Sequence, residues 1–160
     1  SVLLAALGRY LTEGGDVFVY VSALAAALTP PQNTHGAAVA VRHQVGGARF
    51  EALAGFPTAR KAAALLQTHD PLTVLLWLMA HTEDTNLYHR GGTEGAAFVK
   101  AQAAAILTAP PERRAALALA LDDTLIDRWL SPGGCADLLA LALFLARCRG
   151  IPAFLPGMNA

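Results

Sequence analysis

The chain has 160 residues, of which 54% are hydrophobic and only 15% are charged, and twelve basic residues balance twelve acidic ones. A neutral chain lacks the basic surface that binds a nucleic-acid backbone or an anionic membrane, so we expect neither as a partner. The abundant alanine and leucine favour helices, and β-branched residues are too sparse for an extensive sheet. We therefore predict a single all-α domain over residues 1–160, a compact bundle of about seven or eight helices.

Capping residues and helix breakers place the predicted helices along the chain. Asp16, Thr34, Thr58 and Asp70 are N-cap candidates, and glycine or proline pairs stand at most of the predicted helix ends. The run 72–80 is hydrophobic on nearly every side, which is typical of a helix buried at the centre of a domain. Helices are predicted over residues 3–11, 16–28, 34–44, 58–68, 70–80, 93–107, 110–130 and 131–149, with an irregular segment at 48–57. Trp77 and Trp129 are interpreted as core residues.

Neither a membrane span nor a signal peptide is expected. The longest hydrophobic run, 17–28, has about twelve residues, whereas a span needs roughly 18. The first residues lack both an initiator Met and the charged region of a signal peptide, which indicates a fragment or a processed chain. Cys135 and Cys148 would lie on one helix about 20 Å apart, too far for a disulfide. Reduced thiols without an export signal favour the cytoplasm.

A polar cluster follows the most hydrophobic predicted helix. If the helix continues, His81 shares a face with Asp84, and Glu83 shares one with Asn86. Carboxylates beside a core helix are costly unless something binds them, and oxygen ligands suit Mg²⁺. Glu83 and Asp84 are therefore candidate catalytic residues and metal ligands, with His81 and Asn86 as substrate-binding residues. Two alternatives stay open: a solvated helix end, and a zinc site that includes His89.

Two glycine-containing segments are candidate anion sites. In Arg90-Gly91-Gly92, the backbone can approach an anion that the guanidinium binds, although a helix C-cap is the simpler explanation of the glycines. If Ser131 caps a helix, the amides of Gly133 and Gly134 are unpaired donors at its positive end and can hold a phosphate. Close packing of that turn against a neighbouring helix is the alternative.

Further polar residues complete the candidate site. Asp137 lies one turn inside the last predicted helix, where a lone carboxylate needs a partner such as Arg90, Arg128, a metal or a ribose hydroxyl. His35, Arg49 and Glu51 form a third polar group and are further candidate substrate-binding residues, with a loop ion pair between Arg49 and Glu51 as the alternative. Asp122 is a weaker candidate metal ligand, because a solvated helix face is the usual place for such an acid.

Three motifs resemble the triphosphoribosyl-dephospho-CoA synthase family, and the likeness runs over residues 34–145. The first is His81 with Asp84-Thr85-Asn86 and Arg90-Gly91-Gly92. The second is the segment 131–140, Ser-Pro-Gly-Gly-Cys-Ala-Asp-Leu-Leu-Ala, in which Cys135 replaces the family's Ser. The third comprises Thr34-His35-Gly36, the segment 47–52 and Phe56-Pro57, with Phe50 in place of the usual Gly. Two segments of the family's first half are absent, so the chain resembles the C-terminal half of a longer protein.

The resemblance implies a transferase. ATP would lose adenine while its C1′ is attacked by the 2′-hydroxyl of 3′-dephospho-CoA, giving the prosthetic-group precursor of malonate decarboxylase, which we favour, or of citrate lyase. Asp84 and Glu83 would bind Mg²⁺ on the triphosphate, and Arg90 with the amides of Gly133 and Gly134 would hold phosphate oxygens. Asp137 would stabilise the ribosyl cation or accept the hydroxyl proton.

The implied partners are the missing N-terminal half of the protein, a downstream transferase and an acyl carrier subunit. Two rival interpretations remain open, and the first of them uses the same acids. One is an Mg²⁺-dependent hydrolase of a nucleotide or an ADP-ribose-type substrate, in which water replaces the acceptor hydroxyl. The other is a non-catalytic helical fragment.

Overall fold

Helices dominate the computed structural model, which describes residues 2–28 and 48–148. Within those ranges there are eight helices and no strand, which confirms the all-α prediction. The predicted helix over residues 34–44 lies outside the described residues. The helices are α1 (Val2–Glu13), α2 (Val17–Ala27), α4 (Ala48–Leu53), α5 (Pro57–Leu65), α6 (Pro71–His81), α7 (Thr85–Thr108), α8 (Pro111–Asp127) and α9 (Gly133–Arg147).

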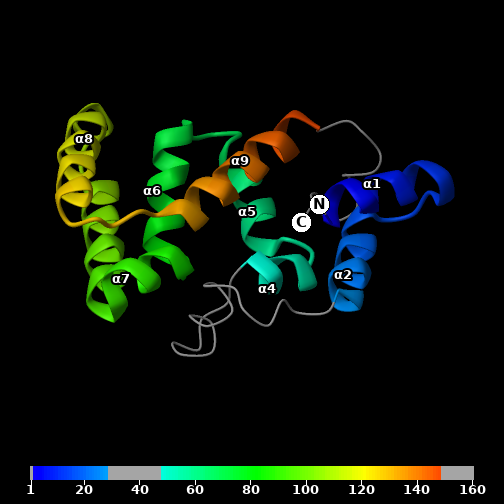
Figure 1. Cartoon of the computed structure of the whole chain (residues 1–160). Coiled ribbons are helices and arrows are strands. Elements are labelled where there is room, and N and C mark those ends of the chain that lie inside the picture. Colours follow the sequence, from blue (N-terminus) through cyan, green and yellow to red (C-terminus); the bar gives the residue numbers. More distant parts are fainter. Residues whose placement is uncertain (1, 29–47, 149–160) are drawn as a thin grey trace.

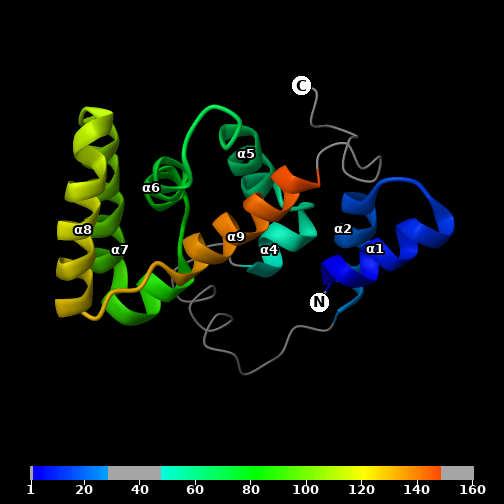
Figure 2. The same ribbon diagram turned by 90° about the horizontal axis from the view of Figure 1, so that it is seen from above.

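The helices form two peripheral pairs around a central group (Figure 1). The antiparallel pair α7 and α8 stands at one end, and α1 with α2 stands at the other. Seen from above in Figure 2, α9 runs through the middle, and it contacts α5, α6 and α7. Because α9 is the last helix in the sequence, this position brings its first turn beside segments that lie about fifty residues earlier.

The hydrophobic helix α6 lies in the core, as its pattern predicts. Leu76 and Leu78 are at most 2% exposed, and they belong to the largest fully buried side chains of the described chain. Its start is fixed by Asp70, whose carboxylate accepts the amide and the hydroxyl of Thr73 at 3.0 and 2.7 Å. The cap therefore fixes the start of a buried helix whose last residue, His81, lines the candidate site.

Several predicted boundaries are wrong. Helix α7 begins at Thr85 instead of residue 93, and α8 ends at Asp127 instead of residue 130. The segment predicted to be irregular contains α4, since residues 48–53 form a short helix. Thr58 does not cap α5, because Phe56 occupies the N-cap with a φ of 57° and Pro57 takes the first helical position. Ser131 does not cap α9, because Pro132 stands at its N-cap.

Trp129 is also not a core residue. Helix α8 ends at Asp127, so Trp129 no longer follows the helical spacing that would bury it. Its backbone adopts a φ of 55°, and the side chain is 79% exposed. Trp77, by contrast, packs partly buried against the core, in agreement with its interpretation.

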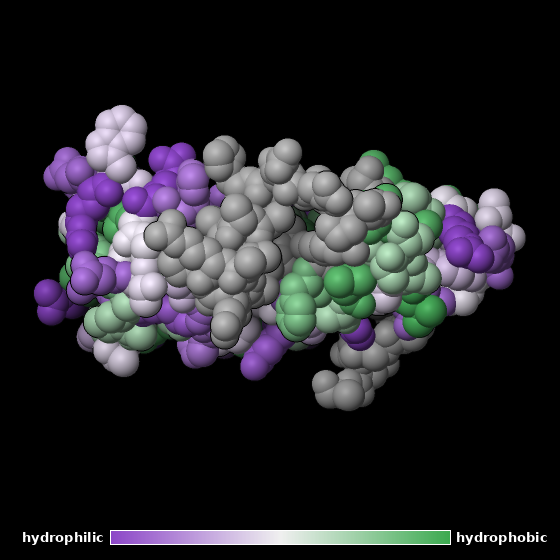
Figure 3. Space-filling model, turned by 60° about the horizontal axis from the view of Figure 1, so that its bottom comes forward, coloured by the Kyte–Doolittle hydropathy of each residue, from purple (hydrophilic) through white to green (hydrophobic). Residues whose placement is uncertain are grey.

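Helix α2 is hydrophobic around its whole circumference, although only part of it is covered. Val17, Val21 and Ala25 are buried, whereas Val19 is 61% exposed. Figure 3 shows the resulting hydrophobic area on the side of the molecule where α1 and α2 lie. Even so, every described helix is too short or too polar to cross a membrane.

Candidate active site

A cleft of about 510 Å³ opens where the first turns of α7 and α9 meet. Helix α4 and the start of α5 supply further lining residues, and the end of α6 with the α6–α7 connection supplies the rest. The cleft gathers seven residues that the sequence nominates from separate segments. These residues are Glu51, His81, Glu83, Asp84, Asn86, Gly134 and Asp137.

Asp84 joins the N-termini of two helices at the floor of this cleft. It is the N-cap of α7, and one carboxylate oxygen accepts the amide of Asn86 at 2.8 Å. The other oxygen accepts the amide of Cys135, in the first turn of α9, at 2.9 Å. Only 4% of Asp84 is exposed. A buried carboxylate that accepts two amides at the positive ends of two helices is stabilised without a metal ion.

The glycines at the start of α9 allow this close approach. A Cβ atom on Gly134 would lie 3.0 to 3.1 Å from the carboxylate atoms of Asp84, and one on Gly133 would lie 2.7 Å from Nδ2 of Asn86. Close packing therefore accounts for both glycines. The anion at this helix terminus is a carboxylate of the chain itself, and phosphate binding by the same amides stays a prediction.

Glu83 is engaged by α7. It forms an ion pair with Lys100 and accepts the hydroxyl of Tyr88 at 2.5 Å. Partial burial opposes its ionisation, but the bonds from Lys100 and Tyr88 outweigh that effect and hold the pKa of Glu83 below its ordinary value. The predicted sharing of helix faces is wrong for this cluster. Helix α6 ends at His81, and Glu83 lies in the connection before α7.

His81 lies at the rim of the cleft in a fixed orientation. Its ring stacks on that of Trp77, with centroids 5.1 Å apart, and its Nδ1 lies 2.8 Å from the Trp77 carbonyl oxygen. Since a carbonyl only accepts, Nδ1 must carry the proton, which leaves Nε2 of the neutral ring as an acceptor.

Two further carboxylates face the cleft with more freedom than Asp84. Asp137 lies on the exposed side of α9, and it forms no hydrogen bond or ion pair with any other described residue. Glu51 is half-buried on α4, and its Oε2 accepts the amide of Thr58 at 3.2 Å. These two side chains are the acids best placed to meet a ligand.

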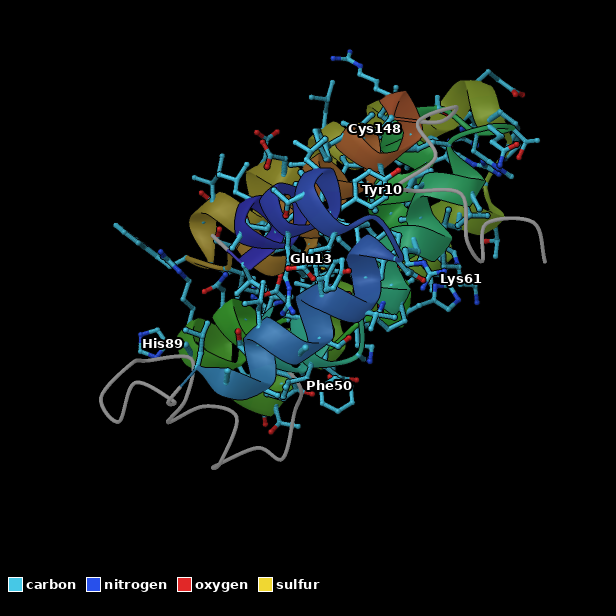
Figure 4. All side chains as sticks on the ribbon, turned by 90° about the vertical axis from the view of Figure 1, so that its right-hand side faces the viewer. Tyr10, Glu13, Phe50, Lys61, His89 and Cys148 are labelled. Atoms are coloured by element: carbon cyan, nitrogen blue, oxygen red, sulfur yellow. The ribbon has the colours of Figure 1, made fainter. Side chains whose placement is uncertain are left out.

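The remaining candidates do not share this cleft. Arg90, Asp122 and Ser131 line a second hollow, of about 340 Å³, near the end of α8. His35 lies outside the described residues, and the side chain of Arg49 lies outside them as well. His89 lines neither hollow, and Figure 4 shows it on the opposite side of the molecule from Lys61.

The glycines after Arg90 also have a structural role. A Cβ atom on Gly91 would come within 2.3 Å of Cδ2 of Leu130, and one on Gly95 would come within 2.9 Å of the same atom. Gly92 adopts a φ of 62° and kinks α7, at the break that the sequence predicts. This segment therefore packs α7 against Leu130, and anion binding by Arg90 stays a prediction.

Only two of the three predicted metal ligands come together. Glu83 and Asp84 line the cleft while Asp122 lines the other hollow. In the described ranges, no three His, Cys, Asp or Glu side chains are grouped so that they could hold a metal ion. The set Glu83, Asp84 and Asp122 therefore does not fit a metal site formed by the protein alone.

Sequence reasoning missed Cys135. Its thiol is 1% exposed and lies 3.3 Å from the hydroxyl of Thr82, while its amide donates to Asp84. Burial raises the pKa of the Cys135 thiol to about 12, and the nearby Asp84 charge acts in the same direction. The only sequence signal was its place in the glycine-containing segment, where a small buried residue packs beside the carboxylate.

The fold and the cleft define an all-α protein in which acids from α4, the α6–α7 connection and α9 converge on one site. The family described as ATP:dephospho-CoA triphosphoribosyl transferase (CitG) matches residues 6–153. The chain belongs to this family, which confirms the resemblance seen in its motifs.

Curated relatives carry the corresponding name. A probable 2-(5″-triphosphoribosyl)-3′-dephosphocoenzyme-A synthase of Albidiferax ferrireducens is 38% identical over 91% of this chain and 57% of its own length. The 2-(5″-triphosphoribosyl)-3′-dephosphocoenzyme-A synthase of Pectobacterium atrosepticum is 43% identical over 70% of this chain and 40% of its own length. The chain thus spans 57% and 40% of the length of these two curated relatives. No solved structure matches it.

Proposed function

We propose that the protein takes part in the transfer of the triphosphoribosyl group of ATP to the 2′-hydroxyl of 3′-dephospho-CoA, with release of adenine. The observation that carries this proposal is the family match over residues 6–153, together with a cleft in which some residues from each of the three motifs meet. The product is 2′-(5″-triphosphoribosyl)-3′-dephospho-CoA, the prosthetic-group precursor of malonate decarboxylase or citrate lyase, and we favour the former.

The reaction forms a bond from the acceptor 2′-oxygen to C1′ and breaks the bond from C1′ to N9 of adenine. The electron pair of the broken bond leaves with adenine, which takes up a proton, and the acceptor hydroxyl loses one. Displacement at an anomeric carbon passes through a state resembling an oxocarbenium ion, which a nearby carboxylate stabilises. An acid-lined cleft supports this chemistry.

We assign different tasks to the acids of the cleft. Asp137, which is exposed, stabilises the developing cation at C1′ or accepts the hydroxyl proton. Asp84 is a positioning residue, since its oxygens hold the first turns of α7 and α9 and thereby set the place of Asp137. Glu83 lies at the cleft with its charge paired to Lys100.

Mg²⁺ is proposed as the counter-ion that the triphosphate brings. This ion is commonly held by one or two carboxylates, with substrate phosphates and water completing its shell. Glu51 and Asp137 are the carboxylates that would meet it, and it would offset phosphate charge beside an acidic cleft.

The rest of the catalytic site is proposed to come from the part of the family protein that this chain does not span. The two cysteines are free thiols, which supports a cytoplasmic enzyme. A downstream transferase and an acyl carrier subunit are then the expected partners.

Adenine release tests the proposal. The chain, together with the missing part of its family protein, is incubated with ATP in the presence and absence of 3′-dephospho-CoA. We expect release only when the acceptor is present, and release that Asp137→Asn strongly reduces. Equal release without the acceptor would instead support the nucleotide hydrolase. No release and no nucleotide binding, measured by calorimetry, would support the non-catalytic fragment.

A further inference from the structure

A smaller hollow of about 370 Å³ adjoins the cleft on the side of α5 and α6. Its lining residues are Pro57, Thr58, Lys61, Trp77, His81 and Thr82. Thr58, His81 and Thr82 line the cleft as well, so these three residues form a common rim between the two spaces. A ligand longer than either space can therefore extend from one into the other.

The hollow and the cleft differ in charge. The cleft is lined by the four carboxylates Glu51, Glu83, Asp84 and Asp137, and by no Lys or Arg among the described residues. The hollow contains the ammonium group of Lys61 and no carboxylate from the described part of the chain. Glu83 is paired with Lys100, and Asp84 is bound by two helix N-termini. The carboxylates of Glu51 and Asp137 therefore repel an anion from the cleft, whereas Lys61 attracts it to the hollow.

Aromatic rings hold the cation and form one side of the hollow. The Nζ atom of Lys61 lies 5.2 Å from the centroid of the Trp77 ring, within the range of a cation–π contact. The exposed ring of His81 stacks on the same indole, and its Nδ1–H donates to the Trp77 carbonyl. The hollow thus combines one positioned positive charge with planar groups on a buried helix.

We propose that the Lys61–Trp77–His81 hollow binds the polyphosphate of an adenine nucleotide, so that its ribose reaches the acid-lined cleft. This assignment rests on the proposed function, in which both substrates are phosphate esters of adenosine. It places the negatively charged part of a substrate beside Lys61 and the carbon that becomes positive beside Asp137. Only the phosphates that carry the Mg²⁺ then come near the carboxylates of the cleft.

The fluorescence of Trp77 provides a direct test on the chain itself. Trp77 and Trp129 are the only tryptophans, so Trp129→Phe leaves the indole of the hollow as the sole emitter. Tripolyphosphate, ATP and 3′-dephospho-CoA are each titrated into this variant. Adenosine, which carries no phosphate, is titrated as the control ligand. We expect a saturable change in emission with tripolyphosphate and with at least one nucleotide.

Single-charge variants distinguish a specific polyphosphate site from general electrostatic attraction of an anion to the protein. Lys61→Met removes the ammonium group and keeps the length of the side chain, and Lys61→Arg retains the charge. Arg113→Met removes a positive charge from the exposed face of α8, away from the hollow. We expect Lys61→Met to weaken polyphosphate binding about tenfold or more, as for the loss of a charge-assisted hydrogen bond. Arg113→Met should leave binding unchanged, and Lys61→Arg should retain most of it.

Comparison of the ligands identifies the substrate that occupies the hollow. If Lys61→Met weakens the binding of ATP alone, the hollow binds the donor. If it weakens the binding of 3′-dephospho-CoA alone, the hollow binds the acceptor. The proposal is overturned if no ligand changes the Trp77 emission, or if Lys61→Met and Arg113→Met weaken binding equally. Polyphosphate binding without adenine release would contradict the proposed function and leave the subsite standing. Adenine release combined with polyphosphate binding that Lys61→Met does not weaken would support the proposed function and contradict the subsite.

Discussion

The carboxylate of Asp84 accepts the backbone amide of Cys135 at 2.9 Å, across 51 residues of sequence. With its second bond, to the amide of Asn86, this contact joins the first turns of α7 and α9. The cleft lies between those turns, so its shape depends on one buried carboxylate.

Replacing Asp84 should therefore destabilise the fold. In Asp84→Asn, an amide group replaces a carboxylate that accepts two backbone bonds, so at least one buried donor loses a charged acceptor. We expect a loss of about 2 kcal/mol or more in the free energy of unfolding. Urea denaturation followed by circular dichroism measures it. The matched control Asp137→Asn, on the exposed side of α9, should leave stability nearly unchanged while it reduces adenine release. If Asp84→Asn is as stable as the wild type, the clamp between the two helices is not the role of Asp84.

Because Gly91 packs closely against Leu130, we expect its replacement to destabilise the fold. Alanine normally stabilises a helix interior relative to glycine by about 0.5–1 kcal/mol. At Gly91, however, the added Cβ would lie 2.3 Å from Cδ2 of Leu130, which is itself buried. We expect Gly91→Ala to lower the unfolding free energy by about 1–3 kcal/mol, the usual effect of overpacking.

Two further variants control this prediction. Gly8→Ala, within α1, has open space around the new Cβ and should raise stability slightly. Leu130→Ala removes the colliding atom, so its cost and that of Gly91→Ala should not add in the double variant. Strict additivity in this double-mutant cycle would show that the two residues do not meet.

The pairing of Glu83 with Lys100 and Tyr88 predicts a stability that depends on pH. The pKa of Glu83 is lowered in the folded state, so the ionised form is favoured there more than in the unfolded chain. The resulting stability is present above the ordinary carboxyl pKa and is lost as the pH falls through the lowered pKa. We expect the wild type to exceed Glu83→Gln in melting temperature near pH 7 and this difference to shrink as the solution is acidified below about pH 4. A difference that stays constant over that range would mean that the ion pair contributes nothing to folding.

The two thiols should differ in reactivity. Cys135 is buried and its thiol pKa is raised to about 12, so almost no thiolate forms near pH 8. Cys148, at the end of α9, is only half-buried, although its pKa is also raised by burial. We expect iodoacetamide to modify Cys148 first and Cys135 only after denaturation, as read by peptide mass spectrometry. Early modification of Cys135 in the folded chain would show that the α7–α9 junction opens in solution.

The sequence alone determined the helical class and most of the helix boundaries. Asp16, Asp70 and the pair Pro110-Pro111 mark helix starts, and Gly92 marks the kink, because caps and breakers act within one turn of chain. Motif spacing was enough to recognise the family, and it nominated most of the polar residues that line the cleft.

Only the tertiary structure decided what those residues contact. Asp84 meets the amide of Cys135, and Glu83 meets Lys100, through contacts that no local pattern encodes. Asp122 lies in a different hollow because its helix, α8, packs along α7. This helix pair and the helices α4 and α5, which line the cleft, lie on opposite sides of α6 (Figure 1). The burial of a side chain and the residues that it contacts depend on how helices far apart in the sequence pack together. A single sequence gives the residue types but not the distances between residues of different helices.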